Sequence, residues 1–172
     1  MKNKFLSIAL YISSFIPLYF LIIVKELIDI ANGNLSFNVT NSVMLGLNLL
    51  LIILGSISVI FLYKKTNFQT IEIETYKNIT RENFLPFFPL FVLFALAFDL
   101  EFISMAVVYV LILVIIGIVY VKNEMFYINP FLNILGYSLY EVSLTDKRKL
   151  RLFMRKKPSS SYILTNGFIT KG

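Results

Sequence analysis

The residues from 83 to 121 constrain the fold more than any other part of the chain, because this block of 39 residues is almost wholly apolar. A single helix of that length would measure about 58 Å, roughly twice the hydrocarbon thickness of a bilayer. The only charges in the block, Asp99 and Glu101, lie near its midpoint. A turn there would divide the block into spans at about 83–99 and 102–121. The alternative is an intramembrane ion or proton site, but the central position of the carboxylates favours the turn.

Two further apolar blocks are long enough to cross a bilayer. The first, residues 5–24, carries no charge and follows a short basic segment. It is longer than the core of a signal peptide and no Ala-x-Ala site follows, so we interpret it as a retained span. Pro17 predicts a kink in it, with the hydroxyls of Ser13 and Ser14 placed to satisfy the freed backbone groups; a functional hinge is the alternative. The second block covers about 42–63.

Composition supports the same class and excludes much chemistry. Charged residues make up only 15% of the chain and hydrophobic ones 58%, whereas soluble domains carry about 25% charged residues. The chain has no Cys, His or Trp, which removes disulfides, thiolate and imidazole catalysis, and the usual zinc sites. We therefore expect a protein that is not an enzyme and that binds no metal or cofactor. The net charge of +6 suits contact with anionic lipid.

The distribution of Lys and Arg predicts the orientation. With four spans, the segments on one side are 1–4, 64–82 and 122–172, which contain two, four and nine basic residues. The other side holds a polar connection at 25–41 and the 99–101 turn, with Lys25 alone. Because cytoplasmic loops are enriched in Lys and Arg, we expect both termini in the cytoplasm.

Strand-like patterns lie outside the spans. Residues 70–75 alternate apolar and acidic side chains, and residues 137–144 are aromatic-rich with similar alternation. Near the end of the chain, runs at 162–165 and 168–170 flank Asn166-Gly167, a favoured type I′ hairpin turn. These patterns predict a small β unit.

The expected fold is an all-α membrane protein with a small cytoplasmic β-rich C-terminal unit. Four transmembrane helices occupy residues 1–126 and the β unit occupies 127–172, with 66–82 as a candidate addition to it. About fifty tail residues are too few for a self-sufficient core. The β unit would therefore need another strand, a second copy or a partner protein to bury its apolar face.

A run of basic residues in the tail is the candidate partner-binding surface. It consists of Lys147, Arg148, Lys149, Arg151, Arg155, Lys156 and Lys157. A solvated edge that faces lipid is one interpretation, and a surface for an acidic protein partner is another. Direct nucleic-acid binding is not expected, because no recognised motif or stacking aromatics accompany the charge.

Small residues on the second span are candidates for helix packing. Ser42, Gly46 and Gly55 allow close approach of a neighbouring helix. The neighbour could belong to the same chain or to a second copy, so a homo-oligomer is expected. Asn48 lies on the same span, where a hydrogen bond between helices is favoured over pore lining.

A resemblance to a known family rests on residues 127–142. This segment reads Tyr-Ile-Asn-Pro-Phe-Leu-Asn-Ile-Leu-Gly-Tyr-Ser-Leu-Tyr-Glu-Val. Together with the length and topology, it resembles the KwaA family, the membrane subunits of the Kiwa anti-phage defence system. The resemblance implies an oligomeric inner-membrane protein that binds KwaB, a cytoplasmic DNA-binding subunit, and carries no catalytic residues.

Two classes of function therefore compete. The first is a scaffold or sensor in the bacterial inner membrane that recruits a cytoplasmic effector through its β tail. The second is a small transporter or pore-forming subunit, suggested by Asn48, Asp99 and Glu101. A bacteriocin-immunity type of membrane protein is a third possibility.

Overall fold

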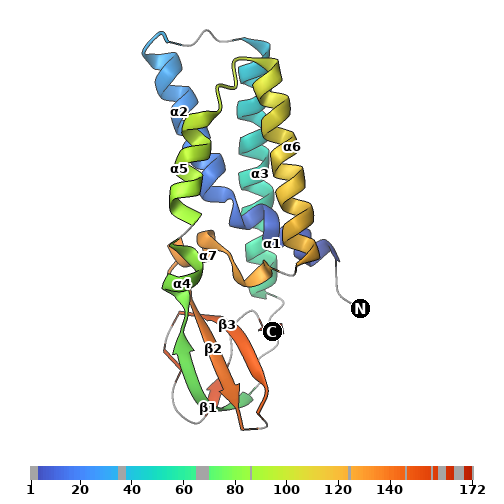
Figure 1. Cartoon of the computed structure of the whole chain (residues 1–172), viewed down its shortest axis with the longest axis vertical. Coiled ribbons are helices and arrows are strands. Elements are labelled where there is room, and N and C mark those ends of the chain that lie inside the picture. Colours follow the sequence, from blue (N-terminus) through green and yellow to red (C-terminus); the bar gives the residue numbers. More distant parts are fainter. Residues whose placement is uncertain are drawn as a thin grey trace.

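A computed structural model of the chain shows a helical bundle standing on a small β-sheet (Figure 1). It describes residues 4–34, 38–64, 70–85, 87–123, 125–145, 147–155, 157–158, 162–164 and 169–171. The helices are α1 (Lys4–Ser14), α2 (Ile16–Ala31), α3 (Val39–Lys64), α4 (Thr80–Phe84), α5 (Phe87–Ala97), α6 (Ile103–Lys122), the 3₁₀ helix η1 (Met125–Tyr127) and α7 (Pro130–Ile134). The strands are β1 (Thr70–Asn78), β2 (Ser138–Leu144), β3 (Lys149–Met154), β4 (Tyr162–Leu164) and β5 (Ile169–Lys171).

The bundle contains three or four stretches that could cross a membrane. Among the described residues, Val39–Ile60, Thr80–Ala97 and Ile103–Lys122 are long and apolar enough to do so. The bent pair formed by α1 and α2 makes a fourth if it is counted as one span. The helices predicted from the apolar blocks are therefore present.

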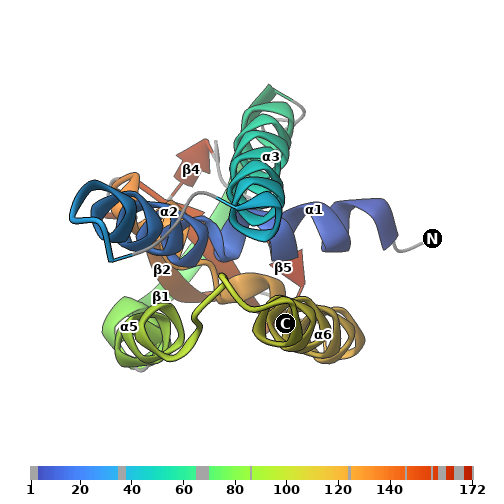
Figure 2. The same ribbon diagram turned by 90° about the horizontal axis from the view of Figure 1, so that it is seen from above.

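The first span bends by 40° between α1 and α2. Pro17 is the second residue of α2 and cannot donate to the preceding turn. The hydroxyls of Ser13 and Ser14 donate hydrogen bonds of 2.9 and 2.7 Å to carbonyls one turn earlier. The kink predicted at Pro17 is confirmed, and it directs α1 across the bundle between α3 and α6 (Figure 2).

The polar connection predicted at 25–41 is wrong at both ends, because α2 continues through Ala31 and α3 already begins at Val39. The sequence estimate ended the helix at its first charge, Lys25. In the structure Lys25 pairs with Asp29 at 3.5 Å, one helical turn later. Charges spaced four residues apart support a helix rather than end it.

The long apolar block divides near its two carboxylates, as predicted. The backbone N–H of Glu101 donates a 3.4 Å hydrogen bond to the Asp99 side chain in the α5–α6 turn. Helix α6 matches the predicted span at 102–121 within one residue at each end. The span at 83–99 differs, because it is divided between α4 and the 11-residue α5. Helix α5 alone rises about 16 Å, so crossing the bilayer requires α4 as well.

The sheet has the strand order β4-β1-β2-β3-β5, with antiparallel neighbours. Its central strand β2 pairs with β1, which contains the alternating segment 70–75 and lies between α3 and α4 in the chain. Two segments more than fifty residues apart in sequence therefore build one sheet.

The hairpin predicted around Asn166-Gly167 is wrong, although strands lie close to both predicted runs. Strand β4 pairs with β1 and β5 pairs with β3, so they form opposite edges of the sheet. The turn residues themselves lie outside the described residues.

Both faces of the sheet are covered from within the chain. One face buries Ile73, Tyr140, Val142, Leu144 and Leu152. The other face carries Leu139 and Phe153, which pack on the ends of the helices; the cluster consists of Val59, Ile79, Phe84, Leu132, Tyr137, Leu139 and Phe153. The extra strand and the helix ends thus supply the cover that the tail alone lacks.

Candidate interaction site

The buried polar groups of the bundle hold helices together. Asn48 on α3 is fully buried, and its amide oxygen accepts a 2.7 Å hydrogen bond from the Tyr109 hydroxyl on α6. Its amide nitrogen donates to the Met44 carbonyl at 2.9 Å. This geometry is the hydrogen bond between helices that was favoured for Asn48 over pore lining.

The three predicted packing residues have different surroundings. A Cβ at Gly55 would lie 2.9 Å from Ile16 and 3.1 Å from the Ser13 backbone, so Gly55 lets α3 touch the bend between α1 and α2. A Cβ at Gly46 would meet nothing within 4 Å. Ser42 donates its hydroxyl hydrogen bond to Asn38 of its own chain at 2.9 Å. Only Gly55 is therefore a packing residue within the chain.

A second close approach was missed by the sequence analysis. Gly117 on α6 is buried, and a Cβ there would lie 2.9 Å from the ring of Tyr11 on α1. A single Gly in a long apolar run gives no periodic signal. The contact depends on the direction of α1 after its bend, which the sequence does not define.

Asn129, within the segment that carried the resemblance, joins the bundle to the sheet. Its side chain accepts a 3.1 Å hydrogen bond from the backbone of Leu132 and so caps α7. The same side chain donates to the Ser13 hydroxyl at 2.9 Å. Asn129 and the following Pro130, both buried, thus fix the chain where it leaves the helices.

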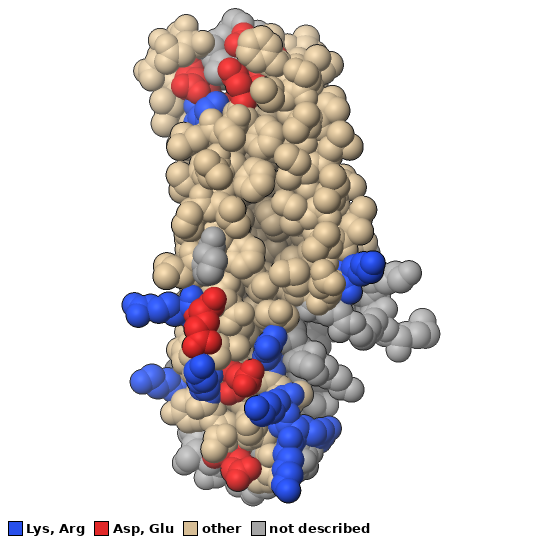
Figure 3. Space-filling model, viewed as in Figure 1, with Lys and Arg blue, Asp and Glu red and all other residues tan. Residues whose placement is uncertain are grey.

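The predicted basic residues separate into two groups along the sheet. Lys147, Arg148 and Lys149 are exposed in the β2–β3 turn, at the end of the sheet that points away from the bundle (Figure 1). We call these three residues the basic tip. Lys147 has a φ of 65°, in the left-handed region that Gly and Asn usually occupy. Figure 3 shows that Lys and Arg gather on the sheet-bearing part of the face it displays.

The second group lies toward the helices and is held by tyrosines. The Arg151 guanidinium lies 4.3 Å from the ring centre of Tyr127, and that of Arg155 lies 4.8 Å from the ring centre of Tyr137. Arg151 also faces Glu141 at 3.7 Å. The sequence analysis missed both tyrosines, because stacking partners more than fifteen residues away have no spacing signal.

Of the remaining basic residues, Lys157 is exposed just beyond β3. Lys156 lies outside the described residues. The described members of the predicted basic run therefore lie at different places along the sheet.

The opposite end of the molecule carries a separate polar cluster. Lys25 donates a 3.1 Å hydrogen bond to the Phe98 carbonyl and pairs with Asp29. The neighbouring Glu26 is only 1% exposed. The Leu100 backbone and Lys25 interact with its carboxylate, but no well-formed hydrogen bond reaches either oxygen in the part of the chain that the structure describes. The sequence analysis had placed Glu26 in a solvated loop, so its burial was missed.

A comparison with known protein families finds a match that includes residues of both the helices and the sheet. The family described as anti-phage protein KwaA matches residues 6–167. The chain belongs to the KwaA family. The resemblance inferred from residues 127–142 is thus confirmed, and membership supports a role in anti-phage defence. Searches of curated proteins and of solved structures find no match.

The match to the KwaA family extends over the bundle, the joint at Asn129 and the sheet through β4, so it is not confined to the apolar helices. In the ranges that the structure describes, no group of three or more His, Cys, Asp or Glu residues could hold a metal ion. The features that could bind a ligand or a partner are therefore the cationic groups at the sheet and the cavities of the bundle.

Proposed function

We propose that this chain is a non-catalytic scaffold and sensor subunit of a bacterial anti-phage defence complex. It spans the inner membrane with both termini in the cytoplasm, assembles as a homo-oligomer, and recruits a cytoplasmic DNA-binding effector similar to KwaB. The family match supports defence, and the apolar helices support a membrane location. The step beyond these findings is recruitment, which rests on the basic tip.

The position of the basic tip is the observation that carries this proposal. Its three cations lie at the end of the sheet away from the helices, where a bilayer around the bundle could not reach them. A lipid-facing role therefore suits them poorly, and an acidic protein surface suits them well. The backbone of Lys147 supports the same conclusion, because a left-handed residue other than Gly costs about 1–2 kcal/mol. Strain of this kind tends to persist at contact sites.

The structure changes one earlier argument for a partner. The tail was expected to require association to cover its apolar face, but β1 and the helix ends already cover it. Recruitment thus rests on charge and not on an unfinished core. Effector binding should accordingly weaken as salt rises.

Assembly of copies is supported by the outer face of α3. Gly46 has open space around it, and large apolar side chains on the same helix are exposed, among them Val43, Leu50 and Ile57. Because small residues permit close helix contact in membranes, a second copy could pack at Gly46. The transporter alternative gains no support from Asn48, which bonds α3 to α6.

The test is co-sedimentation of a KwaB-type effector with membranes that contain the full chain. Lys147→Gly removes one cation and relieves the left-handed strain, so stability should rise while effector recovery falls at least threefold. Lys149→Glu should reduce recovery further. Arg81→Glu, which reverses an exposed charge on α4, is the matched control and should leave recovery unchanged. Unchanged recovery in both tip variants would refute the basic tip as the contact.

A further inference from the structure

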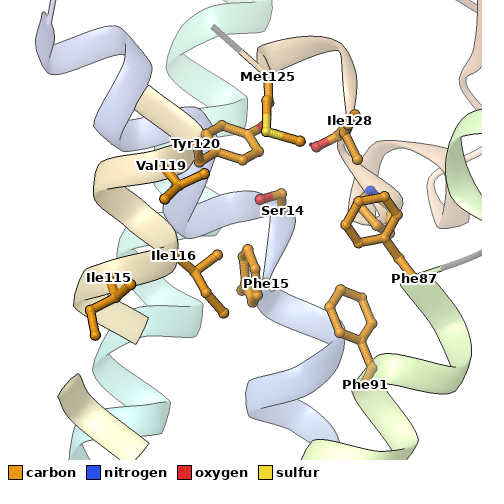
Figure 4. A pocket seen from close by; sticks show the side chains of 11 residues that line it. Ser14, Phe15, Phe87, Phe91, Ile115, Ile116, Val119, Tyr120, Met125 and Ile128 are labelled. Carbon is orange, nitrogen blue, oxygen red and sulfur yellow. Dashed lines mark hydrogen bonds between the residues drawn. The ribbon is translucent and has the colours of Figure 1, made fainter. Parts of the chain in front are cut away.

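An apolar cavity of about 180 Å³ lies between α5 and α6 (Figure 4). Its lining consists of Ser14, Phe15, Phe87, Phe91, Ile115, Ile116, Val119, Tyr120, Met125, Ile128 and Pro130. The two hydroxyls in this wall are already used: Ser14 donates to the Tyr11 carbonyl at 2.7 Å, and Tyr120 to the Ile128 carbonyl at 2.9 Å. The lining is almost wholly apolar and the cavity is partly open to the outside of the bundle, so it favours a hydrocarbon over water.

The cavity lies at the end of the bundle that meets the sheet. Phe87 is the first residue of α5, Tyr120 belongs to the last turn of α6, and Met125 and Ile128 follow that helix. If the helices cross a bilayer, as proposed above, this level is the boundary of the leaflet on the sheet side. An acyl chain of a lipid in that leaflet is then the hydrocarbon that can enter the cavity.

A cation lies on the same short segment that contributes to the wall, because β3, which carries Arg151, contacts η1. Tyr127 stands between the wall residues Met125 and Ile128 in sequence, and its ring holds the Arg151 guanidinium at 4.3 Å. Arg151 is about one-third exposed and faces Glu141, whose carboxylate lies 3.7 Å away. A guanidinium pairs well with phosphate, because its N–H groups match two oxygens at once.

We propose that the α5–α6 cavity binds one acyl chain of an anionic phospholipid, with the lipid phosphate bound by Arg151. The Tyr127 ring positions the guanidinium, and Glu141 competes with the phosphate for it. Basic groups beside cavities between spans commonly bind such headgroups. This inference rests on the proposed membrane location alone and is independent of effector recruitment.

The experiment is native mass spectrometry of the full chain in detergent, with added phosphatidylglycerol or phosphatidylcholine. We expect at least fivefold more retained phosphatidylglycerol, and Arg151→Ala should abolish this preference. Ile116→Trp, which fills the cavity, should reduce retention of both lipids at least threefold. Glycerol 3-phosphate at matched concentration should not displace the lipid, because it has no acyl chain.

Glu141→Gln distinguishes lipid binding from a structural ion pair. Removal of the competing carboxylate should raise phosphatidylglycerol retention about twofold, whereas a structural pair would make Glu141→Gln behave like Arg151→Ala. If Arg151→Ala fails to fold, this variant still decides the question. Equal retention of the two lipids, or a loss of retention in Glu141→Gln, would overturn the proposal. Alkaline carbonate extraction, run in parallel, reports membrane insertion separately.

Discussion

The Tyr109 hydroxyl donates a 2.7 Å hydrogen bond to the Asn48 side chain, and this bond links α6 to α3 where both residues are buried. Helix α6 otherwise packs mainly on α1 and leaves cavities beside both α3 and α5. This bond and the hydrogen bond from the Tyr11 hydroxyl on α1 to the Leu113 carbonyl are among the buried polar contacts that tie α6 to the neighbouring helices in the described residues.

Replacement of Tyr109 by Phe should lower the free energy of unfolding. The variant removes the donor and leaves the buried Asn48 oxygen unpaired, which costs about 1–2 kcal/mol. Unfolding in mixed detergent micelles measures the change. In a double-mutant cycle with Asn48→Leu, the two losses should overlap by about 0.5–1.5 kcal/mol, since they remove the same bond. Additive losses would show that the bond contributes nothing.

A larger side chain should change the stability of the chain at one glycine of α3 and leave it unchanged at another. Gly55→Leu must displace Ile16 and the Ser13 backbone, so it should destabilise the chain by about 1–3 kcal/mol. Gly46→Leu meets open space within the chain and should leave the stability of a single copy unchanged. If copies assemble through this face, Gly46→Leu should instead reduce the oligomer fraction in native mass spectrometry. Equal effects of both variants on stability would contradict the assignment.

The lengths of the apolar blocks, and the charges that interrupt them, allowed the apolar helices to be predicted closely. Helix α6 and the Asp99–Glu101 turn follow directly from a block that is too long for one span, and the bend follows from Pro17. The sequence criterion failed at Lys25, because a charged residue was taken as the end of the helix. In the structure, α2 continues past the apolar block and includes Lys25.

The contacts that build the candidate site could not be predicted in the same way. The sequence between strands β4 and β5 favours a hairpin turn. The strands nevertheless pair with β1 and β3, which also contribute side chains to the buried apolar face. Likewise, Arg151 was predicted as part of a uniform basic run. Its tyrosine partner lies on η1, and only the fold brings the two together.

Conversion of Glu26 to Gln should preserve or increase stability. Glu26 is buried, and loss of hydration at its carboxylate outweighs the weak interactions that the Leu100 backbone and Lys25 make with it. A buried group of this kind opposes folding, so an amide of the same shape should gain on the order of 1 kcal/mol. Asp29→Asn is the matched control: it loses a partly exposed pair with Lys25 and should cost about 0.5 kcal/mol. A clear loss of stability in Glu26→Gln would reveal a partner for the carboxylate.

The proposed orientation can be checked with single cysteines, because the native chain has none. Asn34 follows α2 and Lys149 begins β3; both are exposed, and they lie at opposite ends of the molecule. With the basic sheet in the cytoplasm, Asn34→Cys should react with an impermeant thiol reagent added to intact cells, and Lys149→Cys should react only after permeabilisation. The physical reason is the excess of Lys and Arg on the sheet side, which favours retention of that side in the cytoplasm. The opposite labelling pattern would place the basic tip outside the cell, where a cytoplasmic effector could not reach it.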